Sequence, residues 1–387
     1  MSRFAFLSSP ALSNYELAPG HPFKPVRAEL TETLLDACGL LHSGERLQPV
    51  RLPTAALSHV HDPDYVDLVR DVSNGKTRDD SFAHGLGTGD NPIFPGMHDA
   101  ILSVCDATAT AVSLVASGEA DRAVNFSGGL HHAHSDRASG FCVYNDLAVA
   151  IEEAGRRFGT RIACIDLDAH HGDGTQELFY SRGDVLTISL HESGRYLFPG
   201  TGHTYETGRD AGRGCSVNAP LEPFTEDASY LEVFEAVVPA ALDWFRPDLI
   251  VLQGGADSHR LDPLADLSLT LTGMTRAWQR VIELSELYCD GRLVATGGGG
   301  YDAFRTVPRA WAHLWALMTG RELPQELPAS WHAHWHGRGV EGLPTSSLDG
   351  PADFPEQPRR RTISNQNRAM LARLDSATSR LRQEIRL

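Results

Sequence analysis

From residue 122 onward, short apolar runs alternate with longer stretches of helical periodicity. The apolar runs are partly β-branched and have the length of buried strands. This alternation favours an α/β fold with a central, mostly parallel sheet and helices on both faces, because parallel strands need long crossover connections. We expect strands at 123–126, 162–165, 185–190, 249–252 and 293–296, and helices at 145–158, 228–245, 275–288 and 303–318.

The chain has 387 residues, enough for one large α/β domain or for two smaller ones. Neither an internal repeat nor a linker divides the alternating region, so we expect a single domain. Because the composition changes near residue 323, we place the main domain at 1–323 and a C-terminal extension at 324–387. Within the extension, the tract WHAHWH at 331–336 is typical of an exposed turn. Residues 368–382 favour a helix that packs on the body of the domain or on a partner subunit.

Before the alternating region, prolines and glycines separate shorter helical patterns at 28–38, 64–71 and 98–116. Asp62 followed by proline is a typical helix start, with the aspartate as N-cap. We interpret His59 and His61, which precede this start, as polar loop residues.

The composition excludes some classes of function. The formal net charge of −16 argues against a nucleic-acid partner, since such proteins need a basic surface. The six cysteines form no C-x-x-C pair, which fits free thiols in a reducing compartment. No stretch approaches the roughly 18 apolar residues of a membrane helix. We therefore expect a cytoplasmic protein that binds neither nucleic acid nor membrane.

Acidic and imidazole side chains are concentrated directly after the predicted strand at 162–165. In extended backbone, alternate residues share a face, so Asp166, Asp168 and His170 can converge on one point. A carboxylate and an imidazole at i and i+2 are natural ligands for a divalent metal. On its own the pattern is equally compatible with a polar loop closed by glycines.

Polar groups after three other predicted strands support the metal interpretation. Asp257, in a glycine-rich turn, would be a third protein ligand beside Asp168 and His170, which leaves one position for water as in catalytic zinc sites. The adjacent His131 and His132 need carboxylates to orient them, and the central stretch supplies Asp166 and Asp173. Tyr301, after four glycines, can donate to a developing oxyanion.

Together these motifs resemble those of the histone deacetylases, a family of the arginase–deacetylase superfamily. The chain is class I-like, and among bacterial members it is similar to the acetoin-utilisation deacetylases. The resemblance covers roughly residues 1 to 320 and rests on motifs in the family's order: 128–133 (GGLHHA), 139–142 (SGFC), 166–174 (DLDAHHGDG), 254–257 (GGAD) and 297–301 (GGGGY).

The resemblance implies a role for each matching residue. Asp168, His170 and Asp257 would bind zinc, or iron(II), since two aspartates and one histidine suit either ion. His132, backed by Asp173, would be the general base and acid, and His131, backed by Asp166, would tune its electrostatics. Tyr301 would hold the oxyanion together with the metal. The resemblance further implies a structural potassium site at Asp166, Asp168, His170, Ser189 and Leu190, channel walls at Gly140, Phe141 and Phe198, a rim carboxylate at Asp90, and an arginine of the acetate-exit region at Arg27.

The implied activity is metal-dependent hydrolysis of acyl-lysine in proteins or peptides, with an acetyl-CoA synthetase as one conceivable substrate. A two-manganese arginase would need further carboxylates. An acetylpolyamine amidohydrolase shares the chemistry, but Leu264 stands where some polyamine-selective relatives carry an acidic residue, and an apolar wall suits lysine methylenes better than a second ammonium. A non-catalytic acyl-lysine binding module would need neither Tyr301 nor the His–Asp pairs. The sequence leaves the oligomeric state open.

Overall fold

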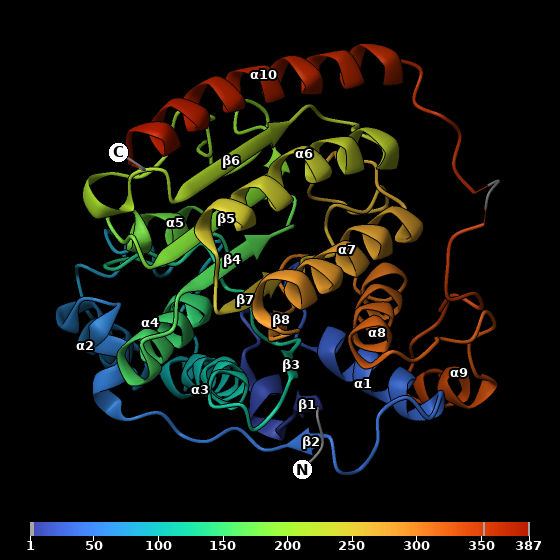
Figure 1. Ribbon diagram of the computed structural model, residues 1–387. Helices are drawn as coiled ribbons and strands as arrows, with labels where there is room; N and C mark the ends of the chain where they lie inside the picture. The colour runs from blue at the N-terminus through green and yellow to red at the C-terminus, as the bar shows by residue number, and fades with distance from the viewer. Residues whose placement is uncertain (1–3, 351–352, 386–387) are drawn as a thin grey trace.

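The computed structural model describes residues 4–350 and 353–385, and in these residues one sheet of eight strands forms the centre of the molecule (Figure 1). The strand order is β2-β1-β3-β8-β7-β4-β5-β6, and each described pairing is parallel. The predicted single α/β domain is therefore confirmed. The strands are β1 (Phe4–Leu7), β2 (Arg46–Leu47), β3 (Arg122–Asn125), β4 (Ile162–Asp166), β5 (Val185–Glu192), β6 (Ser216–Leu221), β7 (Leu249–Gln253) and β8 (Leu293–Thr296).

Helices cover both faces of the sheet, and each face has its own apolar core. Successive residues of β4 point to opposite sides, so that Ile165 belongs to the core beneath α1, α6, α7 and α8, and Cys164 to the core beneath α2, α3 and α4. The helices are α1 (Val26–Ala37), α2 (Pro63–Ser73), α3 (Met97–Ala116), α4 (Asp146–Phe158), α5 (Asp173–Phe179), α6 (Asp227–Phe245), α7 (Leu271–Cys289), α8 (Thr306–Thr319), α9 (Ala329–His336) and α10 (Arg360–Ile385).

The start of α2 follows the prediction, with Asp62 accepting a hydrogen bond from the N–H of Asp64 at 2.9 Å. A cap of this kind contributes about 1 kcal/mol to helix stability. The predicted helix at 275–288 begins earlier, because Thr270 caps α7 by accepting from the N–H of Gly273.

Several elements were not predicted from the sequence, namely β1, β2, β6, α5 and α9. The expected exposed turn at 331–336 is wrong. These residues form α9, and the helical spacing places Trp331 and Trp335 on one buried face.

The expectation that no stretch approaches a membrane helix was also too strong. Helix α3 is long and apolar enough to cross a membrane by length and composition. However, 67% of its 18-residue window is buried in the protein, where it packs against α4 and β3. It is the central helix of one of the two apolar cores.

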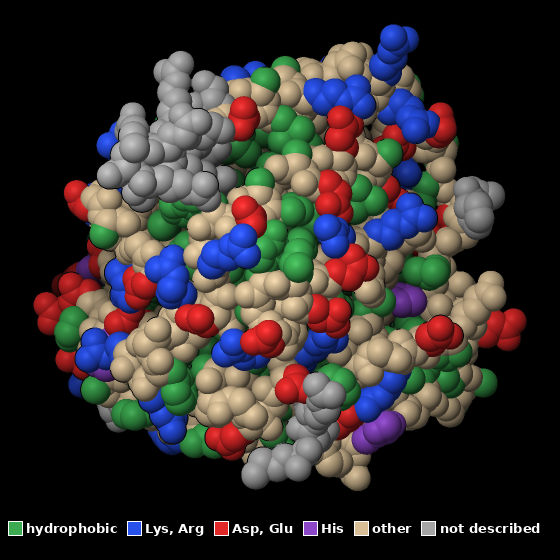
Figure 2. All heavy atoms as spheres, in the orientation of Figure 1, with side chains coloured by type: hydrophobic (Ala, Val, Ile, Leu, Met, Phe, Trp, Pro, Cys, Tyr) green, Lys and Arg blue, Asp and Glu red, His purple; other side chains and the backbone are tan. Residues whose placement is uncertain are grey.

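The last helix, α10, lies across α6 and β6 (Figure 1). It contacts them through buried Met370 and Leu374, while Asn367 donates to the hydroxyls of Thr225 and Ser229 at 2.8 and 3.0 Å. On the face that includes α6 and α7, basic and acidic side chains are interspersed (Figure 2). This face therefore carries no continuous basic patch.

Candidate active site

The chemically active residues lie at the carboxyl ends of four neighbouring strands, β3, β8, β7 and β4. In the sequence these strands come in the order β3, β4, β7, β8, which differs from their order in the sheet. The loops that follow them therefore meet although they are far apart in the sequence. Ligand sites of open α/β sheets occur at such points, where the strand order changes.

Asp168, His170 and Asp257 form a compact buried group whose ligand atoms all lie within 4.8 Å of one another. The Nδ1 atom of His170 is 2.9 Å from Asp257 Oδ2 and 3.2 Å from Asp168 Oδ1. Burying two carboxylates beside each other is costly unless a cation neutralises them. The donor set and its convergence therefore fit a divalent metal ion.

Neighbouring hydrogen-bond donors bind the carboxylate oxygens of Asp168 and Asp257 that face away from His170. Asp168 Oδ2 accepts from Gln253 Nε2 and from the N–H of Gly299, both at 2.7 Å, and Asp257 Oδ1 accepts from the N–H of Ala169 at 2.8 Å. These bonds orient both carboxylates so that their other oxygens face His170. A Cβ atom on Gly299 would lie 1.9 Å from Asp257 Oδ2, so this position of the glycine loop cannot carry a side chain.

His131 and His132 stand beside the metal group, each with its own carboxylate. The Nδ1 atoms of the two rings lie 2.7 Å from Asp166 Oδ2 and 2.7 Å from Asp173 Oδ1, respectively. Their Nε2 atoms approach to 3.1 Å. The two carboxylates fix the orientation of both rings, and the two Nε2 atoms lie next to each other on the side away from these carboxylates.

The two histidines differ in their protonation. Burial lowers the pKa of His132 to about 4, and the charge of His131 acts in the same direction. Burial also lowers the pKa of His131, but the negative charges of Asp166 and Asp168 outweigh it and raise this pKa to about 9. His132 is thus the member of the pair with a free nitrogen lone pair at neutral pH, as a general base requires.

Tyr301, from the loop after β8, lies beside His170 of the metal group. Its ring centroid is 6.2 Å from that of His170 and 5.7 Å from that of Phe141. Burial raises its pKa, so the phenol keeps the proton that it can donate. Arg27, which is buried, donates from Nη1 to the carbonyls of Gly298 and Gly300 at 3.0 and 2.7 Å, and so holds the glycine loop that carries Tyr301.

The predicted channel residues surround His132 and Tyr301. A Cβ atom on Gly140 would lie 2.4 Å from His132 Cδ2 and 2.9 Å from Phe198 Cε1, and the rings of Phe198 and His132 are 5.0 Å apart. Phe141 packs on Tyr301. These side chains form an apolar wall over the site.

Leu264 and Asp90 lie farther out. The N–H groups of Leu264 and Tyr301 both donate to Asp262, at 2.9 and 2.7 Å, so one carboxylate links the exposed leucine to Tyr301. Asp90 is exposed and acts electrostatically on His21, whose ring packs edge-on against Phe141 at 4.6 Å.

The residues of the expected potassium site are adjacent. Asp166 and Ser189 are register partners in β4 and β5, and Leu190 follows in β5. The hydroxyl of Tyr230, from α6, is buried with no hydrogen-bond partner among the described residues, and nearby carboxylates including Asp166 raise its pKa in addition to burial.

His61 does lie in the loop before α2, but it is a buried structural residue and not merely a polar residue of that loop. His61 is 2% exposed and connects the backbone of His134 to that of Asn145. Asn145, also unassigned by sequence reasoning, caps α4 and donates to the carbonyls of His131 and Ala133. The asparagine before a helical pattern was a usable capping signal, but His61 acts over a long sequence distance that local patterns do not register.

Comparison with known proteins agrees with this geometry. A family model described as "Histone deacetylase domain" matches residues 21–318. The chain belongs to the histone deacetylase family. This chain is 42% identical over 364 residues to "Acetoin utilization protein AcuC" of Bacillus subtilis (strain 168), and the match covers 94% of each chain. It is 37% identical over 385 residues to the AcuC protein of Staphylococcus aureus (strain MRSA252), covering 99% of each.

Solved structures with the same fold are described as an HDAC homolog from Aquifex aeolicus and an HDAC homolog complexed with SAHA. Each has 27% sequence identity to this deacetylase and a TM-score of 0.83, and the match covers 94% of this chain and 99% of the other. The arginase–deacetylase fold and the membership implied by the sequence motifs are thus confirmed.

Proposed function

We propose that this deacetylase uses a divalent metal, zinc or iron(II), to remove acetyl or other acyl groups from lysine side chains of proteins. One observation carries the proposal: Asp168, His170 and Asp257 form a buried metal-type group with the His131–His132 pair and Tyr301 beside it. A hydrolytic site of this kind needs a Lewis acid, a proton carrier and an oxyanion donor.

When bound at Asp168, His170 and Asp257, the metal supplies Lewis acidity that lowers the pKa of water and polarises an amide carbonyl. His132, oriented by Asp173, accepts the proton of the attacking water and returns it to the leaving amine. The hydroxyl of Tyr301 donates a hydrogen bond to the oxyanion. A potassium ion at Asp166, Asp168, His170, Ser189 and Leu190 would stabilise the strand ends beneath this site.

The substrate proposal rests on the apolar wall. Phe198 packs on His132 and Phe141 on Tyr301. Exposed Leu264, whose N–H shares Asp262 with that of Tyr301, would continue the wall toward the surface. Such a wall fits the four methylene groups of a lysine side chain, whereas a second ammonium would lose solvation there. Asp90 would contact the backbone of a peptide at the rim. We further propose that the protein acts in the cytoplasm, on an acylated metabolic enzyme such as an acetyl-CoA synthetase.

The test is turnover of an acetyl-lysine peptide and of acetylated polyamines by the metal-reconstituted protein, side by side. Preference for the peptide is the expected result. Preference for the polyamine would retain the amidohydrolase chemistry and overturn the substrate proposal. Turnover of neither, by protein shown to contain metal, would overturn deacetylation and point to a different acyl group or to a non-catalytic binding protein. A parallel assay on acetylated acetyl-CoA synthetase tests the named substrate.

A further inference from the structure

The carboxylate of Asp173 is shared between two histidines. Its Oδ1 atom lies 2.7 Å from Nδ1 of His132, and its Oδ2 atom lies 3.3 Å from Nε2 of His134. The other nitrogen of His134, Nδ1, lies 2.6 Å from Glu177 Oε2. Four side chains therefore form one continuous chain, His132–Asp173–His134–Glu177, of which the proposed function uses the first two.

The position of His134 is fixed from several sides. Its backbone N–H donates to the carbonyl of Arg137 at 3.0 Å, and its own carbonyl accepts from His61 Nδ1 at 2.8 Å. Asp173 and Glu177 are four residues apart on α5 and thus share one helix face. Since His134 is 5% exposed, its ring is enclosed between the two carboxylates.

This geometry favours a protonated ring. A neutral imidazole carries one N–H and could donate to one of the two carboxylates, while its other nitrogen would turn a lone pair toward the second. An imidazolium donates to both. Burial lowers the pKa of His134, but the hydrogen bonds to Asp173 and Glu177 outweigh it and raise the pKa to about 9. The charged and titratable groups around His134 are His132, Asp173 and Glu177, with Asp136 and Arg137 on its own loop and His61 before α2.

We propose that His134 is a positioning residue for the reaction: as an imidazolium it donates to Asp173 and Glu177 at once and holds Asp173 in the orientation that His132 needs. The inference rests on the proposed function. The positive ring also offsets part of the negative charge of Asp173 and so makes His132 a weaker base than a simple His–Asp pair would be.

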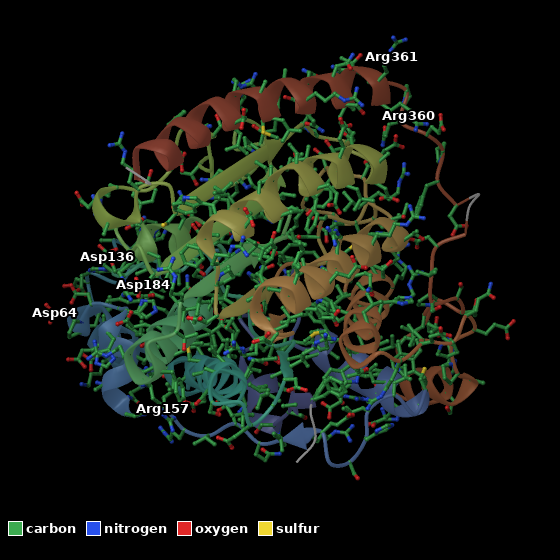
Figure 3. All side chains as sticks on the ribbon, viewed as in Figure 1. Asp64, Asp136, Arg157, Asp184, Arg360 and Arg361 are labelled. Carbon is green, nitrogen blue, oxygen red and sulfur yellow. The ribbon has the colours of Figure 1, made fainter. Side chains whose placement is uncertain are left out.

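The chain also connects the site to solvent. The Glu177 side chain is 53% exposed and lies 3.7 Å from Arg137 Nη2, and Arg137 contacts Asp136. Figure 3 shows Asp136 at the edge of the molecule, near Asp64, and both residues line the same acidic surface hollow. The protonation state of His134 is thus coupled to the charges of solvent-exposed side chains, namely Glu177, Arg137 and Asp136.

The first test uses the intact, metal-loaded protein and needs no turnover. Histidine ¹⁵N NMR at pH 7.5 is expected to show a His134 ring with protons on both nitrogens. A neutral ring at this pH would overturn the proposal. In His134→Gln, the Nδ1–H resonance of His132 is expected to move, because Asp173 loses its second cationic partner. An unmoved resonance would also count against the positioning role.

The second test is kinetic. His134→Gln keeps one donor toward Asp173 but no charge, and kcat is expected to fall about tenfold with KM unchanged, as for other partners that orient catalytic side chains. Glu177→Gln keeps the His134 ring but removes one carboxylate, so the pKa of His134 and kcat are both expected to fall, the latter by less. The matched control is His59→Gln, since His59 and Glu153 form a similar pair at 2.8 Å that contacts none of the site residues named above.

The pH dependence separates positioning from mere structural support. The ratio of wild-type to His134→Gln kcat is expected to be about ten at pH 7.5 and to approach one as pH rises through about 9, where His134 loses its proton. A ratio that stays constant with pH would overturn the charge-dependent role. If the wild type turned over no acyl substrate, the proposed function would fail, whereas the NMR test would still decide the protonation and the coupling of His134.

Discussion

The ring of His61 accepts a hydrogen bond at Nε2 from the backbone N–H of Asn145, at 3.0 Å, and donates from Nδ1 to the carbonyl of His134. The acceptor role of Nε2 determines the tautomer, with the proton on Nδ1. Asn145 in turn donates to the carbonyl of His131. A residue outside the metal group therefore positions, through Asn145, the backbone that carries His131 and His132.

We expect His61→Ala to destabilise the protein by about 3 kcal/mol, because it leaves two buried backbone groups without partners and opens a cavity. Urea denaturation followed by circular dichroism measures this free energy of unfolding. His59→Ala is the control, since its pair with Glu153 is partly exposed and contributes less than about 1 kcal/mol. Equal losses in the two variants would contradict the role assigned to His61.

The stability of the wild type is also expected to decrease in acid through His61. Burial lowers its pKa from 6.5 to about 4, so between these values the unfolded chain binds a proton that the folded protein does not. The contribution is complete above pH 6.5 and is lost as pH falls toward 4, with a total of about 3 kcal/mol. The free energy of unfolding of His61→Gln should change less between pH 7 and pH 5 than that of the wild type. Parallel curves would exclude His61 as the source.

Removing the phenol of Tyr301 is expected to abolish most turnover without loss of metal. Tyr301→Phe loses one oxyanion donor, which typically costs about 10²–10³ in kcat. Steady-state kinetics and elemental analysis on the same sample measure both properties. Tyr205→Phe is the control, because Tyr205 is 72% exposed. Full activity in Tyr301→Phe would show that the hydroxyl takes no part in the reaction.

Metal removal is expected to lower both activity and thermal stability. Ligands that bind the folded state alone stabilise it by about 2.7 kcal/mol at a concentration of 100 times Kd. The difference in Tm with and without a chelator should therefore be large in the wild type and small in Asp257→Asn. Asp243→Asn, an exposed site on α6, should behave like the wild type. The same chelator response in Asp257→Asn and the wild type would place the metal elsewhere.

Asp349 in the C-terminal extension contacts the loop that follows Asp257. Its Oδ2 atom lies 3.0 Å from His259 Nε2, and its Oδ1 atom lies 3.2 Å from Nη1 of Arg309. Since the Asp349 side chain is 5% exposed, Asp349→Asn is expected to cost about 3 kcal/mol, the typical loss when one partner of a buried ion pair is removed. Metal affinity should fall as well. Unchanged values for both would show that the contacts of Asp349 are dispensable for the site.

The regular elements could largely be predicted from the sequence because their patterns are local. The strands β4 and β7 are continuous apolar runs up to their last residue, β5 begins with mostly apolar residues, and α4 and α6 begin within one residue of the expected positions. The missed strands are short or interrupted. For example, β2 has two residues, and β6 includes Pro220, which weakens a strand pattern although a proline is tolerated on an edge strand.

The site itself was predictable as far as its motifs extend. The Asp168–His170 pair and the adjacent His131 and His132 are visible in the sequence, because neighbouring ligands leave a local pattern. His134 and Asp349 are not. Each acts through a partner on another segment, such as Glu177 for His134, and that proximity exists only after the sheet has assembled.

The contact between Asp349 and His259 also bears on how this region is assembled during synthesis. The two residues are 90 positions apart, and Asp349 follows all eight described strands in the sequence, so it emerges from the ribosome after them. The strands of the sheet can therefore pair before the loop bearing Asp257 gains this support. A nascent chain that has not yet reached Asp349 would contain the paired strands with a loosened loop at Asp257.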